Sequence, residues 1–183
     1  MINNGILDKI HTQFTEINID LFNKWATEVI FSWRWWISLV LTIIPWIIWI
    51  KYRDKNNTLR LLFTGLVVAT LTEFLDIIGI SYGLLHYDWI LIPLMPIYFP
   101  WDFSLFPVSI MFLLQVKPKI SPLIKALLYG IFSALLMEPL FGKISMYHTM
   151  HWNKWYSFML YIPLYLLFNM IYNITEKLTK VRS

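Results

Sequence analysis

The 183-residue sequence contains no cysteine and little charge. Without thiols the chain can form neither disulfides nor thiolate metal sites, and it has no cysteine nucleophile. Only 14% of the residues are charged, against roughly 25% in soluble domains, whereas 58% are hydrophobic. The mean hydropathy is +0.58. This composition excludes an ordinary soluble domain and indicates a polytopic membrane protein.

Recognisable catalytic motifs are also missing. The sequence has no P-loop, no nucleophile elbow, no dinucleotide fingerprint and no HExxH pattern, so we expect no cofactor. Any chemistry must therefore rest on histidine and carboxylate side chains. The net charge of +4 is better explained by basic cytoplasmic loops of a membrane protein than by nucleic acid, which we do not expect as a partner.

Five apolar segments are long enough to cross about 30 Å of hydrocarbon, which takes roughly 20 helical residues. We place them at residues 35–50, 61–80, 101–116, 120–141 and 155–174. The predicted fold class is all-α, a polytopic membrane bundle of five transmembrane helices. Residues 1–32 form an amphipathic segment before it, residues 33–176 form the five-span domain, and residues 177–183 form a basic cytoplasmic tail.

The basic residues predict the orientation. Ten of the fifteen lysines and arginines fall in two alternate loops and the tail, whereas residues 81–101 contain none. The positive-inside rule then places the C-terminus in the cytoplasm and, with five spans, the N-terminus outside. The ten residues are Lys51, Arg53, Lys55, Arg60, Lys117, Lys119, Lys125, Lys177, Lys180 and Arg182.

The N-terminal segment has the pattern of an interfacial helix. Apolar residues recur at steps of three and four residues, with charged residues between them. An anchor on the outer leaflet is the favoured interpretation, and a lid or a partner-binding helix stays open. The apolar positions are Ile6, Ile10, Phe14, Ile17, Leu21, Trp25 and Val29.

Four carboxylates, Glu73, Asp76, Asp102 and Glu138, lie within or at the ends of the apolar spans. The predicted orientation puts all four in the outer half of the bundle. Each would cost roughly 2.5–3.5 kcal/mol at a helix centre facing lipid, so we expect them to share one polar cavity. They are the candidate catalytic residues.

Small residues precede two of these acids at four-residue steps: Gly65 and Ala69 before Glu73, and Gly130 and Ala134 before Glu138. Close helix packing explains the small residues equally well.

The predicted outer loops carry the remaining candidates. Pro93, Pro96 and Pro100 exclude a continuous helix in the apolar stretch 86–102, which we expect to cap the acidic cavity. In the next outer loop, His148 and His151 are candidate metal ligands, with Glu138 and Asp88 in reach. Interfacial hydrogen bonding is the alternative role of these histidines.

Four ordered motifs, "FLDIIG", "FPWDFSLFPV", "MEPLFG" and "HWNKWYSF", resemble the signatures of a family of small, uncharacterised multi-span membrane proteins of Gram-positive bacteria. The resemblance covers residues 36–172 and implies a multi-pass protein of the bacterial cell membrane, without implying an activity.

A more distant resemblance is to the small lycopene cyclase domains, which close isoprenoid end groups by proton chemistry. Those domains carry an aspartate late in one span, a Trp/Tyr-containing loop and then a Pro-x-Glu-Glu-like motif. Here Asp76 and Asp102 hold the matching positions, whereas Phe103 replaces the second acid. The resemblance implies acid/base chemistry on an isoprenoid.

Two functional classes follow. In the first, the protein binds, or acts by acid/base chemistry on, a lipid or isoprenoid from the outer half of the bilayer. In the second, the same acids serve a proton- or cation-coupled transporter or channel. A role as a subunit of a membrane complex stays open. The expected partners are membrane lipids and a lipid or isoprenoid ligand, and a homo-oligomer is left open.

Overall fold

The computed structural model describes residues 4–93 and 97–180. Parts of the predicted N-terminal segment (1–3) and basic tail (181–183, with Arg182) lie outside the described residues, as does Pro96 of the predicted capping loop. The described chain is 79% helix and 2% strand. The predicted all-α class is therefore confirmed.

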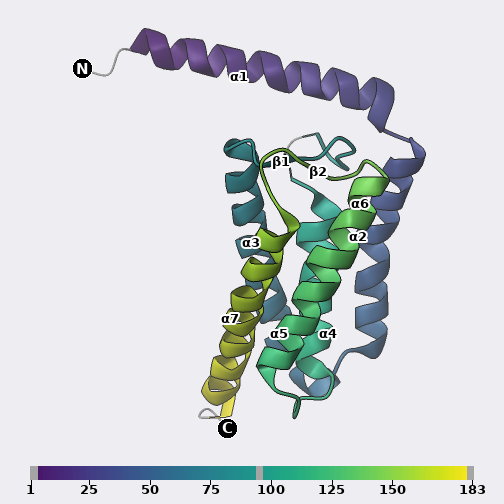
Figure 1. The fold of residues 1–183 in the computed structure, drawn as a ribbon, viewed down its shortest axis with the longest axis vertical. Coiled ribbons are helices and arrows are strands. Elements are labelled where there is room, and N and C mark those ends of the chain that lie inside the picture. Colours follow the sequence, from purple (N-terminus) through teal and green to yellow (C-terminus); the bar gives the residue numbers. More distant parts are fainter. Residues whose placement is uncertain (1–3, 94–96, 181–183) are drawn as a thin grey trace.

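The helices form an upright bundle with a single helix lying across one end of it (Figure 1). The bundle contains five passes that alternate in direction: α2, α3, η3 with α4, α5 with η4 and α6, and α7. The elements are α1 (Asn4–Lys24), η1 (Trp25–Val29), α2 (Trp33–Tyr52), η2 (Lys55–Asn57), α3 (Thr58–Ser81), β1 (Leu85–His86), η3 (Trp101–Leu105), α4 (Phe106–Gln115), α5 (Pro122–Gly130), η4 (Ile131–Met137), α6 (Glu138–Lys143), β2 (His148–Thr149) and α7 (Lys154–Lys180).

Four helical stretches in the described part of the chain are long and apolar enough to cross a membrane. They are Trp33–Tyr52, Lys55–Ser81, Pro122–Lys143 and Lys154–Glu176. The remaining pass, Trp101–Gln115, is a shorter apolar helix. At 1.5 Å per residue its 15 residues extend only about 22 Å, less than the hydrocarbon thickness.

The bundle core is apolar and rich in aromatic residues. Phe106, Met111, Tyr165 and Phe168 are each at most 1% exposed and belong to one cluster formed by α3, α4, α5 and α7. The predicted small residues let these helices approach closely. A Cβ atom on Gly65 would lie 2.7 Å from the sulfur of Met111 on α4.

Lys125 was predicted to lie in a cytoplasmic loop. The structure instead places it within α5, where it is only 7% exposed. Its Nζ donates hydrogen bonds to the backbone carbonyls of Leu113 (2.5 Å) and Val116 (2.7 Å). The last carbonyls of a helix lack intrahelical partners, so this lysine caps the end of α4. The long aliphatic stem is buried while the ammonium is satisfied.

Two passes contain π-helical turns, η3 and η4, which the sequence analysis did not anticipate. Pro107, the second residue of α4, has no N–H to donate to the preceding turn. The carbonyl of Phe103, within η3, instead accepts a hydrogen bond from Trp46 Nε1 of α2 (2.9 Å). Such π turns are often found at functional sites, and each of these two positions a carboxylate.

Helix α1 lies across the end of the bundle and continues into η1 (Figure 1). Its apolar side chains remain exposed, with Phe14 at 66% and Ile17 at 64%. Trp25 of η1 fastens this region to the bundle, because its indole nitrogen donates to the carbonyl of Ile90 (3.1 Å).

Candidate functional site

A half-open cavity of about 280 Å³ lies at the β1–β2 end of the bundle. Three of the four predicted carboxylates line it: Asp76 from α3, Asp102 from η3 and Glu138 from α6. The walls are otherwise mostly apolar and aromatic. The aromatic lining residues are Tyr87, Tyr98, Trp101, Phe106, Phe141, Tyr147, Trp152 and Tyr161.

Asp76 and Asp102 form the most enclosed part of the site. Their carboxyl groups lie within hydrogen-bonding reach of each other, and Asp102 is only 1% exposed. The Oδ2 atoms of both are buried without a hydrogen-bond donor among the described residues. Because two carboxylate oxygens both accept, their contact becomes a hydrogen bond only when one carries a proton. Two such groups cannot both stay ionised at low cost, so the pair calls for a proton or a cation.

The Tyr87 hydroxyl lies within hydrogen-bonding reach of Asp76. Burial, followed by the negative charge of Asp76 and then of Asp102, raises the pKa of Tyr87 well above its ordinary value. The phenol therefore stays neutral and can donate its proton to Asp76. Its ring stacks on Tyr98, with the centroids 5.2 Å apart, which fixes its position.

Glu138 is held by a separate network on the α7 side of the cavity. Tyr161 donates to Glu138 Oε1 (3.0 Å), and the Ser157 hydroxyl is within hydrogen-bonding reach of the same carboxyl. Trp152 Nε1 donates to Ser157 Oγ (2.7 Å), which leaves the serine proton free for Glu138. The acid is thus oriented from two sides.

The cavity continues toward the surface beside Glu138. A neighbouring hollow of about 350 Å³ shares Glu138, Tyr147 and Trp152 with it and extends to Asn153 and Lys154 at the start of α7.

Glu73 does not line the cavity, although it was predicted to share it. It is half-buried on α3, and its negative charge acts on Asp102. The small residues on its stripe have a packing role, since Gly65 meets Met111. On the second stripe, Gly130 meets Phe158 of α7 while Glu138 does face the cavity.

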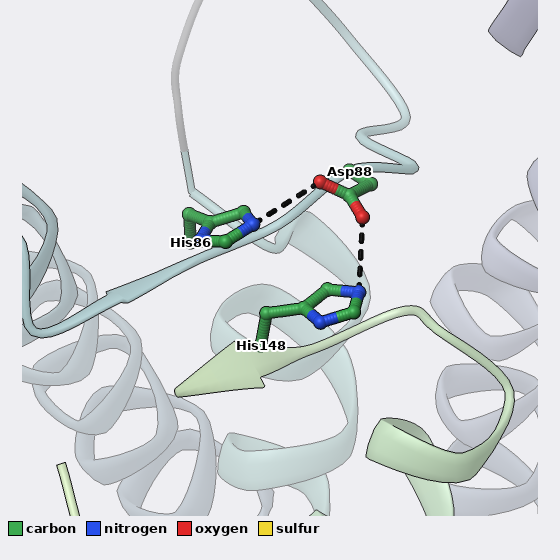
Figure 2. A group of neighbouring side chains, drawn as sticks. All are labelled: His86, Asp88 and His148. Atoms are coloured by element: carbon green, nitrogen blue, oxygen red, sulfur yellow. Dashed lines mark ion pairs between the residues drawn. The ribbon is translucent and has the colours of Figure 1, made fainter. Parts of the chain in front are cut away.

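His148 and Asp88 lie together, as predicted, but their third neighbour is His86 rather than His151. Asp88 lies between the two imidazoles, 3.3 Å from His86 Nε2 and 2.9 Å from His148 Nε2 (Figure 2). His151 is exposed and is not part of this group. Glu138 lines the cavity instead.

The tyrosines that surround the acids were not predicted from the sequence as site residues, and neither was His86. The sequence around His86 contains a pattern that could have pointed to it, because polar and apolar residues alternate there. Leu85 and Tyr87 line the cavity, whereas His86 and Asp88, which alternate with them, belong to the second group. Extended backbone directs successive side chains to opposite faces. The predicted role of the 86–102 stretch as a cap over the acids agrees with Tyr87 and Tyr98 in the cavity wall.

Comparison with known proteins gives no relative: no family model, no curated protein and no solved structure matches the chain. Neither of the two resemblances gains support from these searches. A function must therefore be argued from the cavity itself.

Proposed function

We propose that this protein is an integral membrane protein whose outward-facing cavity takes up the end group of a lipid or isoprenoid and acts on it by acid/base chemistry. The observation that carries the proposal is the grouping of Asp76, Asp102 and Glu138 within one largely aromatic cavity. Buried carboxylates in a membrane protein are costly and are usually functional.

The volume favours an end group over a whole lipid. At about 30 Å³ for each water-sized group, a cavity of about 280 Å³ holds about nine such groups. This is the size of a small headgroup or a terminal isoprenoid unit. The remaining chain would leave through the neighbouring hollow beside Glu138 and Trp152.

The polar groups favour a ligand with cationic or developing cationic character. Asp76 and Asp102 provide a buried pair that is stabilised by a positive charge, and the faces of Trp101 and Tyr98 can contribute cation–π attraction. In a reaction, one carboxylic acid of the pair would donate a proton, and Glu138 would accept one from the opposite wall.

The alternative, a proton- or cation-coupled transporter, has less support. A path from the acids toward the basic end of the bundle would have to pass the core cluster. That cluster contains Leu61, Val68, Ile110 and Met111, each fully buried at 0% exposure. We therefore prefer a cavity open to one side of the membrane.

The test is an untargeted mass-spectrometric inventory of the lipids that co-purify with the wild type and with Glu138→Gln. We expect a defined lipid or isoprenoid, enriched over the bulk membrane extract, to be retained by the wild type and lost or chemically altered with Glu138→Gln. Co-purifying lipids that match the bulk extract in both samples would contradict the proposal.

For the membrane topology, we propose five spans, with the N-terminus outside and the C-terminus in the cytoplasm. The short pass Trp101–Gln115 would complete its crossing through the capping loop that precedes it. The bundle end opposite β1 and β2, where α7 also ends (Figure 1), carries Lys51 in the last turn of α2, Lys55 in η2, and Lys117 and Lys119 in the loop after α4. The positive-inside rule supports a cytoplasmic location of this end.

Cysteine labelling tests this topology, because the natural chain has no cysteine. Asn56→Cys and Met150→Cys lie at opposite ends of the bundle, and Met150 is 60% exposed. A membrane-impermeant thiol reagent on intact cells should label only Met150→Cys. Labelling of Asn56→Cys alone would invert the orientation and move the cavity to the cytoplasmic half.

We propose that α1 lies on the membrane surface as an interfacial helix. Its exposed apolar residues and its charged residues support this role, and its main contact is with η1, the segment that follows it. Deletion of residues 1–24 should therefore leave the detergent-solubilised bundle folded, as judged by its thermal transition. Loss of all folded protein would show that α1 belongs to the core.

A further inference from the structure

The group formed by His86, Asp88 and His148 lies outside the acidic cavity and has no part in the proposed ligand chemistry. We propose that these three residues bind one divalent transition-metal ion, with Zn²⁺ as the ion to test. The metal would fasten the β1 segment to the β2 segment across the end of the bundle. This inference is independent of the proposed function.

The backbone brings the two histidines together from distant parts of the sequence. β1 and β2 pair in antiparallel register, with His86 directly opposite His148. Side chains of directly opposed residues lie on the same face of such a pair. Asp88 lies in the bend that follows β1, and its carboxyl group lies between the two imidazoles (Figure 2). Three potential ligand side chains thus come together.

The opposite face of this segment is already used by the cavity. Leu85, Tyr87 and Tyr147 line the cavity, whereas His86 and His148, which alternate with them, do not. The histidines are therefore not needed to close the cavity wall. Figure 2 shows both imidazoles directed toward the carboxyl group of Asp88.

The distances suit a metal site. One nitrogen from each histidine and one oxygen from Asp88 all lie within 4.8 Å of one another. Metal–ligand bonds of 2.0–2.2 Å in a tetrahedral Zn²⁺ site place neighbouring ligand atoms about 3.3–3.6 Å apart. The separation of 3.3 Å between His86 Nε2 and Asp88 Oδ1 lies in this range. The separation between His148 Nε2 and Asp88 Oδ2 is shorter, at 2.9 Å.

The surroundings of His148 Nε2 are a second observation that points to a metal ligand. Its Nε2 atom is shielded from solvent and lies 2.9 Å from Asp88 Oδ2, yet it makes no directed hydrogen bond with any described residue. Two atoms that lie close together without sharing a hydrogen bond are typical of two ligands of one metal ion. The ring stacks on His86 at 5.1 Å and 10°, so both rings are held side by side.

The ligand types narrow the choice of metal. Two neutral imidazoles and one carboxylate suit Zn²⁺ and related divalent transition metals, whereas Ca²⁺ and Mg²⁺ prefer oxygen ligands throughout. The three side chains are 38–46% exposed, so an ion can enter from solvent and a water molecule can complete the coordination.

The test uses the full-length protein in detergent, stripped with a chelator and titrated with Zn²⁺. We expect the wild type to bind one Zn²⁺ per chain, with a higher thermal transition in its presence. His148→Gln and Asp88→Asn should each bind at least roughly tenfold more weakly, since each loses a ligand. His151→Gln is the matched control, because it removes a histidine of the same loop that lies outside the group, and it should bind like the wild type.

Two outcomes would overturn the proposal. One is Zn²⁺ binding by the wild type no tighter than by the Asp88→Asn variant, which would leave a simple histidine–aspartate ion pair. The other is loss of binding in His151→Gln with binding kept in His148→Gln. Asp88→Asn has nearly the same shape as the wild type, so it decides the question even if His148→Gln fails to fold. Zn²⁺ binding is measured without the lipid. A protein that binds no Zn²⁺ would therefore not contradict the function proposed for the acidic cavity.

Discussion

Replacement of Asp102 by asparagine distinguishes between a functional and a structural role of the carboxyl pair formed by Asp76 and Asp102. Asp102 is 1% exposed and lies within hydrogen-bonding reach of Asp76, and the Oδ2 atoms of both are buried without a donor. In Asp102→Asn the new amide N–H donates to the Asp76 carboxylate, which removes the repulsion and satisfies the orphaned oxygen. Asp102→Ala removes the repulsion but supplies no donor to Asp76 Oδ2, although the Tyr87 hydroxyl stays within hydrogen-bonding reach of the Asp76 carboxyl group.

The two variants are expected to differ in their free energy of unfolding. A hydrogen bond to a charged group contributes about 1.5–3 kcal/mol, whereas a buried acceptor left without a donor costs about 1–3 kcal/mol. Asp102→Asn should therefore match or exceed the wild-type stability, by up to about 3 kcal/mol. Asp102→Ala should be less stable than Asp102→Asn by at least about 1–3 kcal/mol, with a further loss from the cavity it leaves.

The assay is thermal unfolding of the three proteins in the same detergent. For a chain of this size each kcal/mol shifts the transition by about 2–4 °C, so the two variants should differ clearly. Asp76→Asn should behave like Asp102→Asn because the pair is reciprocal. If Asp102→Asn is as unstable as Asp102→Ala, the carboxylate is a structural hydrogen-bond hub and the reasoning on the pair fails.

Three further predictions concern packing, capping and pH. Gly65→Val should lower stability by about 1–3 kcal/mol, because its Cβ would lie 2.7 Å from the sulfur of the buried Met111; thermal unfolding measures the loss. Lys125→Met should cost about 1–3 kcal/mol in the same assay, since the carbonyls of Leu113 and Val116 at the end of α4 lose their charged donor. Hydrogen bonds from the Asn57 side chain and the Asn56 backbone lower the pKa of Asp54 below its ordinary 3.8. The stability that this group contributes is present above pH 3.8 and is lost as the pH falls through the lowered value. The stability difference between wild type and Asp54→Ala should therefore shrink in that acidic range.

Matched variants control these predictions. Gly142→Ala adds a Cβ at 3.7 Å from its nearest neighbour, an ordinary contact, and should be neutral. Lys119→Met replaces an exposed lysine of the neighbouring loop and should leave stability within about 0.5 kcal/mol. A Gly65→Val variant as stable as Gly142→Ala, an equal effect of Lys119→Met and Lys125→Met, or an Asp54→Ala difference that is constant with pH would contradict the respective argument.

The sequence predicts the depth and direction of the buried acids well. Asp76 and Glu138 occur late in their spans and Asp102 at the start of another, so the alternating directions of the passes bring them to one end of the bundle. Hydropathy and helical phase are enough for this step because both are local properties. Glu73 marks the limit of such predictions: it precedes Asp76 by three residues, which is less than a full turn of 3.6 residues, and only Asp76 lines the cavity.

The rest depends on contacts between distant segments. His86 and His148 meet only because β1 and β2 pair, and a two-residue strand leaves no periodic pattern to detect. The π turn at Asp102 depends on Trp46 of another helix, which satisfies the carbonyl of Phe103. The charge of Lys125 predicts a loop position. Its burial is explained only by the nearby end of α4, whose carbonyls accept hydrogen bonds from its ammonium group.

The most direct test of the central claim fills the cavity without touching an acid. Leu160 lines the cavity on α7, whereas its neighbour Met159 faces outward at 69% exposure. Leu160→Trp and Met159→Trp add the same ring to adjacent positions, and the measurement is the amount of the enriched lipid or isoprenoid that co-purifies with each protein. We predict that Met159→Trp retains the ligand at the wild-type level and that folded Leu160→Trp loses it. Equal retention by both variants would contradict a ligand in this cavity.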